Sequence, residues 1–99
     1  MTAHTKLAWD ALRAVEDPEA GISIVDLGLV YAIDEDHGTL TVTITFTSEG
    51  CPAAALIINR VEAALKALPG SPPTRVEVTF EPPWTPHMIS PEARALLGA

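Results

Sequence analysis

The stretch Thr39-Leu-Thr-Val-Thr-Ile-Thr-Phe-Thr47 decides the fold class, because large apolar residues alternate with threonines along its whole length. Side chains of a β-strand point alternately to the two faces of a sheet, so this period of two predicts a strand with one buried face. The β-branched threonines suit the other, more open face. We therefore expect a sheet that is covered on one side only.

Further elements are predicted on both sides of this strand. Before it, residues 29–33 read as a second strand, joined to it by the hairpin loop 34–38, which ends in glycine. After it, apolar residues recur at helical spacing over about 52–68, and Pro69-Gly70 ends that helix. Residues 75–81 alternate again and predict a third strand.

The two ends of the chain add further helices. An apolar stripe at helical spacing covers about residues 5–16, and a short extended piece follows at 22–25. Near the other end, Ser90 is the expected N-cap of a closing helix, with Pro91 at its first position. The order α-β-β-α-β-α predicts a single two-layer α+β domain over residues 1–99. Its small mixed three-stranded sheet should be covered on one face by two helices.

Composition and charge restrict the functions open to this sequence. Its 99 residues are 47% hydrophobic and 19% charged, which fits a globular domain and excludes a disordered chain. The 6 basic and 13 acidic residues give a net charge of −7, so we expect neither a nucleic-acid nor a membrane partner. The longest apolar run, residues 53–58, is far shorter than the ~20 residues that span a bilayer. Residues 1–6 show no apolar leader, so a cytoplasmic protein is expected.

The segment Thr47-Ser-Glu-Gly-Cys-Pro52 carries the single cysteine of the chain and is the strongest candidate for chemistry. Pro52 disfavours helical geometry at Cys51 and itself suits the first helical position, so Cys51 is predicted to be the helix N-cap. Gly50 allows the tight turn before it. At an N-cap, free backbone N–H groups and the helix dipole favour the thiolate, which is a nucleophile or a soft-metal ligand. The alternative is that Cys51 is a small buried apolar residue.

Three further residues could act beside Cys51, and each also has a simpler structural role. His87 lies in a proline-rich loop, residues 82–87, that could fold over the end of the sheet; otherwise it is a plain surface histidine. Asp26 is either a turn residue bonded to local backbone, or a hard ligand or proton acceptor. Trp84 either caps the core or walls a pocket for a partner.

Three segments stand in a consistent order and spacing. They read Ile24-Val-Asp-Leu-Gly-Leu-Val-Tyr31, preceded by Asp17-Pro-Glu19, then Thr47-Ser-Glu-Gly-Cys-Pro52, and Pro82-Pro-Trp-Thr-Pro-His-Met-Ile-Ser90. Together they resemble the SufT/PaaD-like, or metal–sulfur cluster biosynthetic, family of the iron–sulfur cluster assembly domain type, over about residues 7–98. The resemblance implies a compact α/β accessory factor in the maturation of iron–sulfur proteins, mostly non-enzymatic and often dimeric. With one cysteine, the chain resembles the short branch that lacks a cysteine-rich C-terminal segment.

The resemblance also implies roles for individual residues. The reactive cysteine of the family falls on Cys51, and the acid of its first motif falls on Asp26. Its threonine falls on Thr47, and its proline-rich loop falls on Trp84 and Thr85. The metal-handling candidates are Cys51, Asp26 and His87. The supporting pocket or partner loop is predicted to comprise Thr47, Glu49, Gly50, Trp84, Thr85 and His87.

Several positions depart from the usual pattern of the family. Phe80-Glu81 stand where its members usually have Trp-Asp, and His87 stands where they usually have Asp. Residues 53–55 are all alanine in place of Leu-Ala-Asp. These differences remove carboxylates, so they weaken the expectation of a dedicated hard-metal site and leave the argument for Cys51 intact.

Three functions remain open at this point. A cluster needs about four protein ligands, so one cysteine cannot hold it alone. The first hypothesis is a non-enzymatic accessory factor without a tightly bound cofactor, in which Cys51 handles iron, sulfide or a cluster transiently. Apo iron–sulfur client or scaffold proteins, or the second chain of a homodimer, would supply the missing ligands. The alternative is a metal-independent adaptor that binds clients through Trp84 and the acidic surface. The third is a small thiol-dependent enzyme that uses Cys51 with His87 or Asp26.

Overall fold

The computed structural model describes residues 3–70 and 72–97, and its elements follow the predicted order. They are α1 (Ala3–Leu12), β1 (Val30–Asp36), β2 (Thr39–Ile44), α2 (Ala54–Lys66), β3 (Thr74–Val78), the short 3₁₀ helix η1 (Pro86–Met88) and α3 (Pro91–Leu97). The α-β-β-α-β-α order is confirmed, and η1 adds one turn inside the proline-rich loop. No helix within these described ranges has the length and apolar character needed to cross a membrane.

The sheet is mixed, with β2 at its centre. β1 pairs with β2 antiparallel through the short hairpin, and β3 pairs with β2 parallel. Parallel neighbours need a crossover connection, and α2 provides it by carrying the chain back along the sheet. In the register, Val42 lies opposite Ile33 on one side and Val76 on the other. The predicted mixed three-stranded sheet is therefore confirmed.

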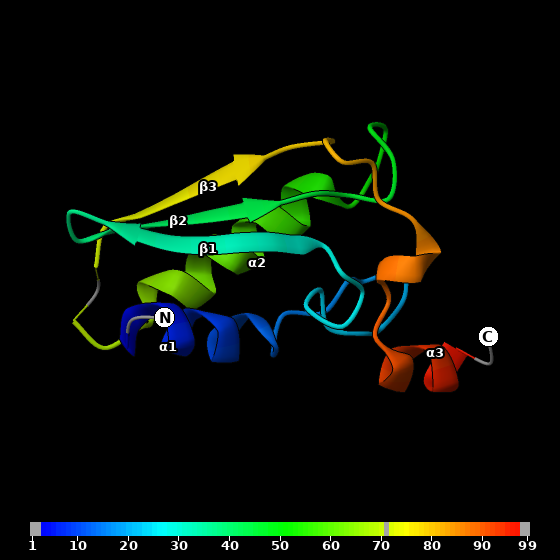
Figure 1. Cartoon of the computed structure of the whole chain (residues 1–99), viewed down its shortest axis with the longest axis horizontal. Coiled ribbons are helices and arrows are strands. Elements are labelled where there is room, and N and C mark those ends of the chain that lie inside the picture. The colour runs from blue at the N-terminus through cyan, green and yellow to red at the C-terminus, as the bar shows by residue number, and fades with distance from the viewer. Residues whose placement is uncertain (1–2, 71, 98–99) are drawn as a thin grey trace.

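Both long helices cover the same face of the sheet, as Figure 1 shows. The apolar residues of β2 are buried toward the helices, whereas Thr39, Thr41 and Thr43 are only half-buried. The core between sheet and helices includes Leu40, Val42 and Ile44 of β2, Ile57, Val61 and Leu65 of α2, and Ala8 and Leu12 of α1. The alternation in the central strand thus decides which face is covered, because only one face carries large apolar side chains.

The segment between α1 and β1 differs from the prediction. Residues 22–25 were expected to be extended, but residues 24–28 form turns. The strand-like pairing described in this segment is one isolated antiparallel bridge between Glu16 and Ser23. The Leu29 amide donates to the Ile24 carbonyl at 2.9 Å, which closes the turn and reverses the chain. β1 consequently begins after this turn and continues as far as Asp36, into the predicted hairpin loop.

Candidate functional site

The topology brings the three motif segments to one end of the sheet. β1 begins where β2 ends, because Val30 pairs with Ile44 in the antiparallel ladder. β3 ends there too, because Ile44 pairs with Val78 in the parallel ladder. The turn before β1, the loop after β2 and the loop after β3 therefore meet at this end, which lies on the right in Figure 1. The predicted site residues come from these loops and turns.

The turn before β1 is a close-fitting platform for η1. Gly28 has a φ of +78°, a left-handed conformation that side chains other than glycine rarely adopt. A Cβ atom at this position would lie 2.4 Å from the carbonyl oxygen of Met88 and 2.8 Å from its Cβ. Glycine is required here for two reasons: its backbone conformation and the close approach of the η1 backbone.

Three hydrogen bonds hold the loop after β3 against the segment that precedes and begins β1. Trp84 Nε1–H donates to the carbonyl oxygen of Leu27 at 2.8 Å. The Tyr31 hydroxyl donates to the carbonyl oxygen of Pro82 at 2.8 Å. The Ser90 amide donates to the Asp26 carbonyl oxygen at 2.7 Å. The first and third motifs of the sequence therefore bind each other, which gives a physical reason for their occurring together.

Asp26 lies at the start of α3, beside the residue that caps this helix. Its Oδ1 accepts from the Ser90 hydroxyl at 3.5 Å. The same hydroxyl accepts the Ala93 N–H at 3.2 Å, so the predicted N-cap role of Ser90 is confirmed. Asp26 thus positions the chain between η1 and α3, as a turn residue would. A ligand role for its carboxylate stays a prediction.

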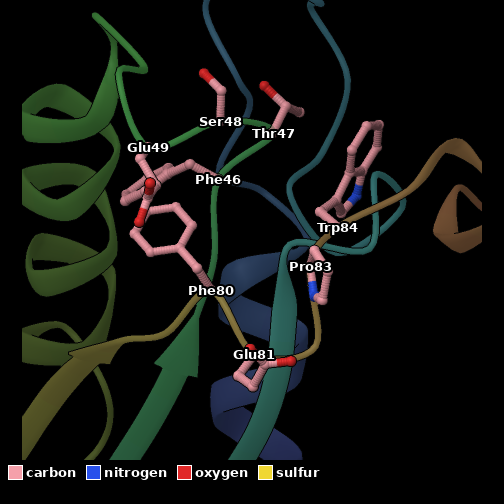
Figure 2. Close-up of a pocket in the computed structure, with 8 residues that line it drawn as sticks. All are labelled: Phe46, Thr47, Ser48, Glu49, Phe80, Glu81, Pro83 and Trp84. Atoms are coloured by element: carbon pink, nitrogen blue, oxygen red, sulfur yellow. The ribbon is translucent and has the colours of Figure 1, made fainter.

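A first hollow of about 360 Å³ opens between the loops that follow β2 and β3. Its lining comprises Phe46, Thr47, Ser48 and Glu49 from the first loop and Phe80, Glu81, Pro83 and Trp84 from the second. The rings of Phe46 and Phe80 contact each other, with centroids 6.5 Å apart and planes tilted by 47°. In Figure 2, Glu49 and Trp84 stand on opposite sides of the hollow. The fold thus brings the predicted pocket residues Thr47, Glu49 and Trp84 together.

A second hollow of about 320 Å³ shares Thr47 and Trp84 with the first. Its other lining residues are Asp17, Glu19, Ala20, Leu27, Ile89 and Leu97. We call the two adjoining hollows the Trp84 groove. Within the described residues, its lining contains four carboxylates and no basic side chain. The groove is therefore an acidic surface with aromatic walls on one side of Trp84 and aliphatic walls on the other.

Cys51 is half-buried and packs against the core, and it does not cap α2. The N-cap of α2 is Ala53, with no side-chain cap hydrogen bond, so the predicted N-cap position of Cys51 was wrong. The reason is local, because two successive turns precede the helix. The Cys51 amide donates to the Ser48 carbonyl at 3.3 Å, and the Ala54 amide donates to the Cys51 carbonyl at 3.2 Å. The helix begins two residues later than Pro52 indicated, so the cap geometry offered as the reason for a thiolate is absent.

Neither the Trp84 groove nor the hollow beside His87 is lined by more than one of the three metal-handling candidates. His87 is exposed on η1 and lines a separate hollow of about 280 Å³ with Pro86, Ile89 and Arg94. Cys51 lines neither that hollow nor the Trp84 groove. In residues 3–70 and 72–97, no group of three or more His, Cys, Asp or Glu side chains is placed to hold a metal ion. Metal handling by these residues stays a prediction.

Two further predicted residues belong to the loops that frame the groove. Thr85 is exposed, and its carbonyl accepts the Met88 amide at 2.9 Å at the start of η1. Gly50 is exposed in the turn before Cys51. The structure adds Tyr31 and Gly28, whose roles are visible only as contacts with the loop after β3. Their place inside the first motif was the one sequence signal that could have found them.

The fold and the groove define a small α+β domain with an acidic groove between its loops and a half-buried cysteine packed against its core. Residues 7–78 match the family described as "Iron-sulfur cluster assembly protein", and the chain belongs to this family. It is 47% identical over 89 residues to the "Fe-S protein maturation auxiliary factor YitW" of Bacillus subtilis (strain 168), covering 89% of this chain and 87% of the relative. The resemblance inferred from the three motifs is therefore confirmed.

Another relative and a solved structure agree with this assignment. The chain is 46% identical over 85 residues to the "Fe-S protein maturation auxiliary factor SufT" of Staphylococcus aureus (strain USA300), covering 85% of this chain and 97% of the relative. The crystal structure of a "Domain of Unknown Function DUF59" from Bacillus anthracis superposes with a TM-score of 0.92 at 38% identity, covering 97% of this chain and 92% of that one. The same fold is thus seen in a relative.

Proposed function

We propose that this protein is an accessory factor in the maturation of iron–sulfur proteins, and that it binds an apo client or scaffold protein at the Trp84 groove. Membership of the iron–sulfur cluster assembly family supports the first half of this proposal. The observation that carries the second half is the position of Trp84, which lines both hollows while its indole is fixed to Leu27 at 2.8 Å. A fixed aromatic side chain between two hollows is a favourable anchor for a protein partner.

The proposal gives Cys51 a transient, non-catalytic part in handling iron, sulfide or a cluster that is cargo. One thiol supplies one ligand, whereas a cluster requires about four. The remaining ligands would come from the client or from a second copy of this chain in a homodimer. A cytoplasmic location belongs to the same proposal, because a free cysteine is maintained in a reducing compartment.

A metal-independent adaptor is the second candidate function. It is favoured by one specific observation: Cys51 packs half-buried against the core and lines neither hollow of the groove. In this case Trp84 would bind the client, and the cysteine would be structural. The two candidates differ only in what the thiol does after the partner has been bound.

Two substitutions separate these candidates in cells whose wild-type copy has been replaced. Trp84→Ala should lower both the capture of clients by the tagged protein and the activity of iron–sulfur enzymes at limiting iron. Trp9→Ala is the matched control, because Trp9 is a half-buried tryptophan of α1 that does not line the groove. If Trp84→Ala leaves both readouts at the level of the control, the groove is not the client site.

Cys51→Ser decides the role of the thiol. A loss of enzyme activity with client capture intact supports handling of iron, sulfide or cluster. Unchanged activity at limiting iron contradicts it and leaves the adaptor. Anaerobic reconstitution with iron and sulfide, read by absorbance and native mass for both forms, tests the same thiol and the homodimer directly.

A further inference from the structure

The described lining of the Trp84 groove contains acidic side chains and no basic one, which favours a cationic partner. Glu49 and Glu81 line the aromatic hollow, and both are exposed. Within the described ranges, neither carboxylate pairs with a basic side chain; the ion pairs of this part of the chain lie elsewhere. The net charge of −7 adds a general attraction for cations. The partner of this hollow should therefore supply the missing positive charge.

The walls of the hollow favour an organic cation over a metal ion. Two glutamates without a third ligand make a poor metal site, and no larger His, Cys, Asp or Glu group is found in the described residues. Phe80 and Trp84 line the hollow beside the carboxylates. Aromatic faces attract a guanidinium or ammonium group, and a carboxylate completes its hydrogen bonding. An arginine or lysine side chain matches both features at once.

The second hollow specifies what should stand next to that cation. It continues from the shared residues Thr47 and Trp84 to the aliphatic side chains of Leu27, Ile89 and Leu97, with Asp17 and Glu19 also in its lining. The Asp17 carboxylate accepts the backbone amides of Glu19 and Ala20. Burial of a large apolar side chain there is favourable by about 25 cal/mol per Å² removed from water. Alternate residues of an extended peptide can enter adjoining hollows, because side chains two positions apart point to the same face of the backbone.

Resting on the proposed role of the groove in client binding, we propose that the Trp84 groove binds an extended segment of the partner protein in which an arginine or lysine stands two residues from a large apolar residue. The cation lies between Glu49 and Glu81, and the apolar side chain lies on the other side of Trp84. The partner is thus defined by a basic–apolar pair of residues. The two charge pairs give selectivity and the aliphatic hollow gives the anchor.

A titration of the isotopically labelled full chain tests this proposal by NMR. The probes are N-acetyl-Leu-Ala-Arg-amide and its neutral isostere N-acetyl-Leu-Ala-citrulline-amide, in which the first and third side chains share a face of the extended backbone. The arginine peptide should shift the indole N–H resonance of Trp84 with a dissociation constant on the order of 1 mM. The citrulline peptide should bind about five- to tenfold more weakly, the ratio expected from two exposed charge pairs.

Two double variants keep the test specific to the groove. Glu49→Gln with Glu81→Gln should remove the preference for the arginine peptide. Glu62→Gln with Asp34→Asn makes the same change in net charge at exposed residues of α2 and β1 outside the groove, and should preserve it. Equal binding of both peptides by the wild-type chain, or a preference that survives in the first variant, would overturn the proposal.

Other occupants give distinct signals. Stoichiometric shifts of the groove resonances with ferrous iron alone would mean a metal site, and shifts on raising the concentration of the chain alone would mean a second copy. Either result overturns the basic–apolar partner. Loss of client capture by Trp84→Ala together with no peptide preference would refute this inference and leave the proposed function standing.

Discussion

Replacement of Gly28 by alanine probes the contact that holds the groove together. The new Cβ would lie 2.4 Å from the Met88 carbonyl oxygen, whereas an ordinary contact begins at 3.4 Å. The η1 segment must therefore move by about 1 Å, or the turn before β1 must open. Both adjustments disturb the hydrogen bonds that Trp84 and Ser90 make to this turn.

The size of the effect follows from two contributions. The left-handed conformation at φ +78° costs an alanine about 1 kcal/mol of folding stability. Each disturbed hydrogen bond contributes about 1 kcal/mol net, so the displacement adds about 2 kcal/mol. Gly28→Ala should lower the free energy of unfolding by about 3 kcal/mol in all, which a domain of ordinary stability survives.

Urea unfolding followed by circular dichroism measures this loss, and Gly21→Ala is the matched control. Gly21 has a φ of +69°, and among the described residues no heavy atom beyond its own chain neighbours lies within 4 Å of a Cβ built there. The control should therefore show the conformational cost alone, about 1 kcal/mol. If the two variants agree within about 0.5 kcal/mol, the close approach of Met88 carries no energy and our account of the platform is wrong.

Two further substitutions test single hydrogen bonds at the same end of the sheet. Trp84→Phe replaces the indole by a smaller aromatic ring and removes the donor to the Leu27 carbonyl, so it should cost at least about 1 kcal/mol in urea unfolding. No loss would mean that the 2.8 Å hydrogen bond does not stabilise the fold. Ser90→Ala removes the cap on the Ala93 amide and should cost about 1 kcal/mol, with faster amide hydrogen exchange confined to α3; uniform exchange across the chain would contradict a local cap.

Local patterns in the sequence predicted most of the fold. The alternation over residues 39–47 predicted β2 and its buried face, and the helical spacing over 52–68 predicted α2. The Ser90 cap was also correct. Each of these patterns involves residues only a few positions apart. The geometry of a helix or strand places such residues on one face wherever the segment lies in the fold.

The candidate site was predicted less completely, because its geometry depends on distant partners. The segment 22–25 was predicted to be extended, but the hydrogen bond from the Leu29 amide to the Ile24 carbonyl closes a turn there. Cys51 was predicted to be the N-cap of α2, but Ala53 occupies that position. The preference of Pro52 for the first helical position contributes only a small free energy. Tertiary packing can therefore move the start of the helix by one or two residues. The motifs indicated which loops matter and not how they meet.

The sequence by itself determined the order of the elements, the covered face of the sheet and the acidic balance, since these follow from periodicity and composition. Only the tertiary structure decided that Trp84 would be fixed to Leu27, 57 positions away, and that two hollows would share its side chain. Such contacts exist because the antiparallel and parallel pairings of one central strand bring three distant loops to the same end of the sheet.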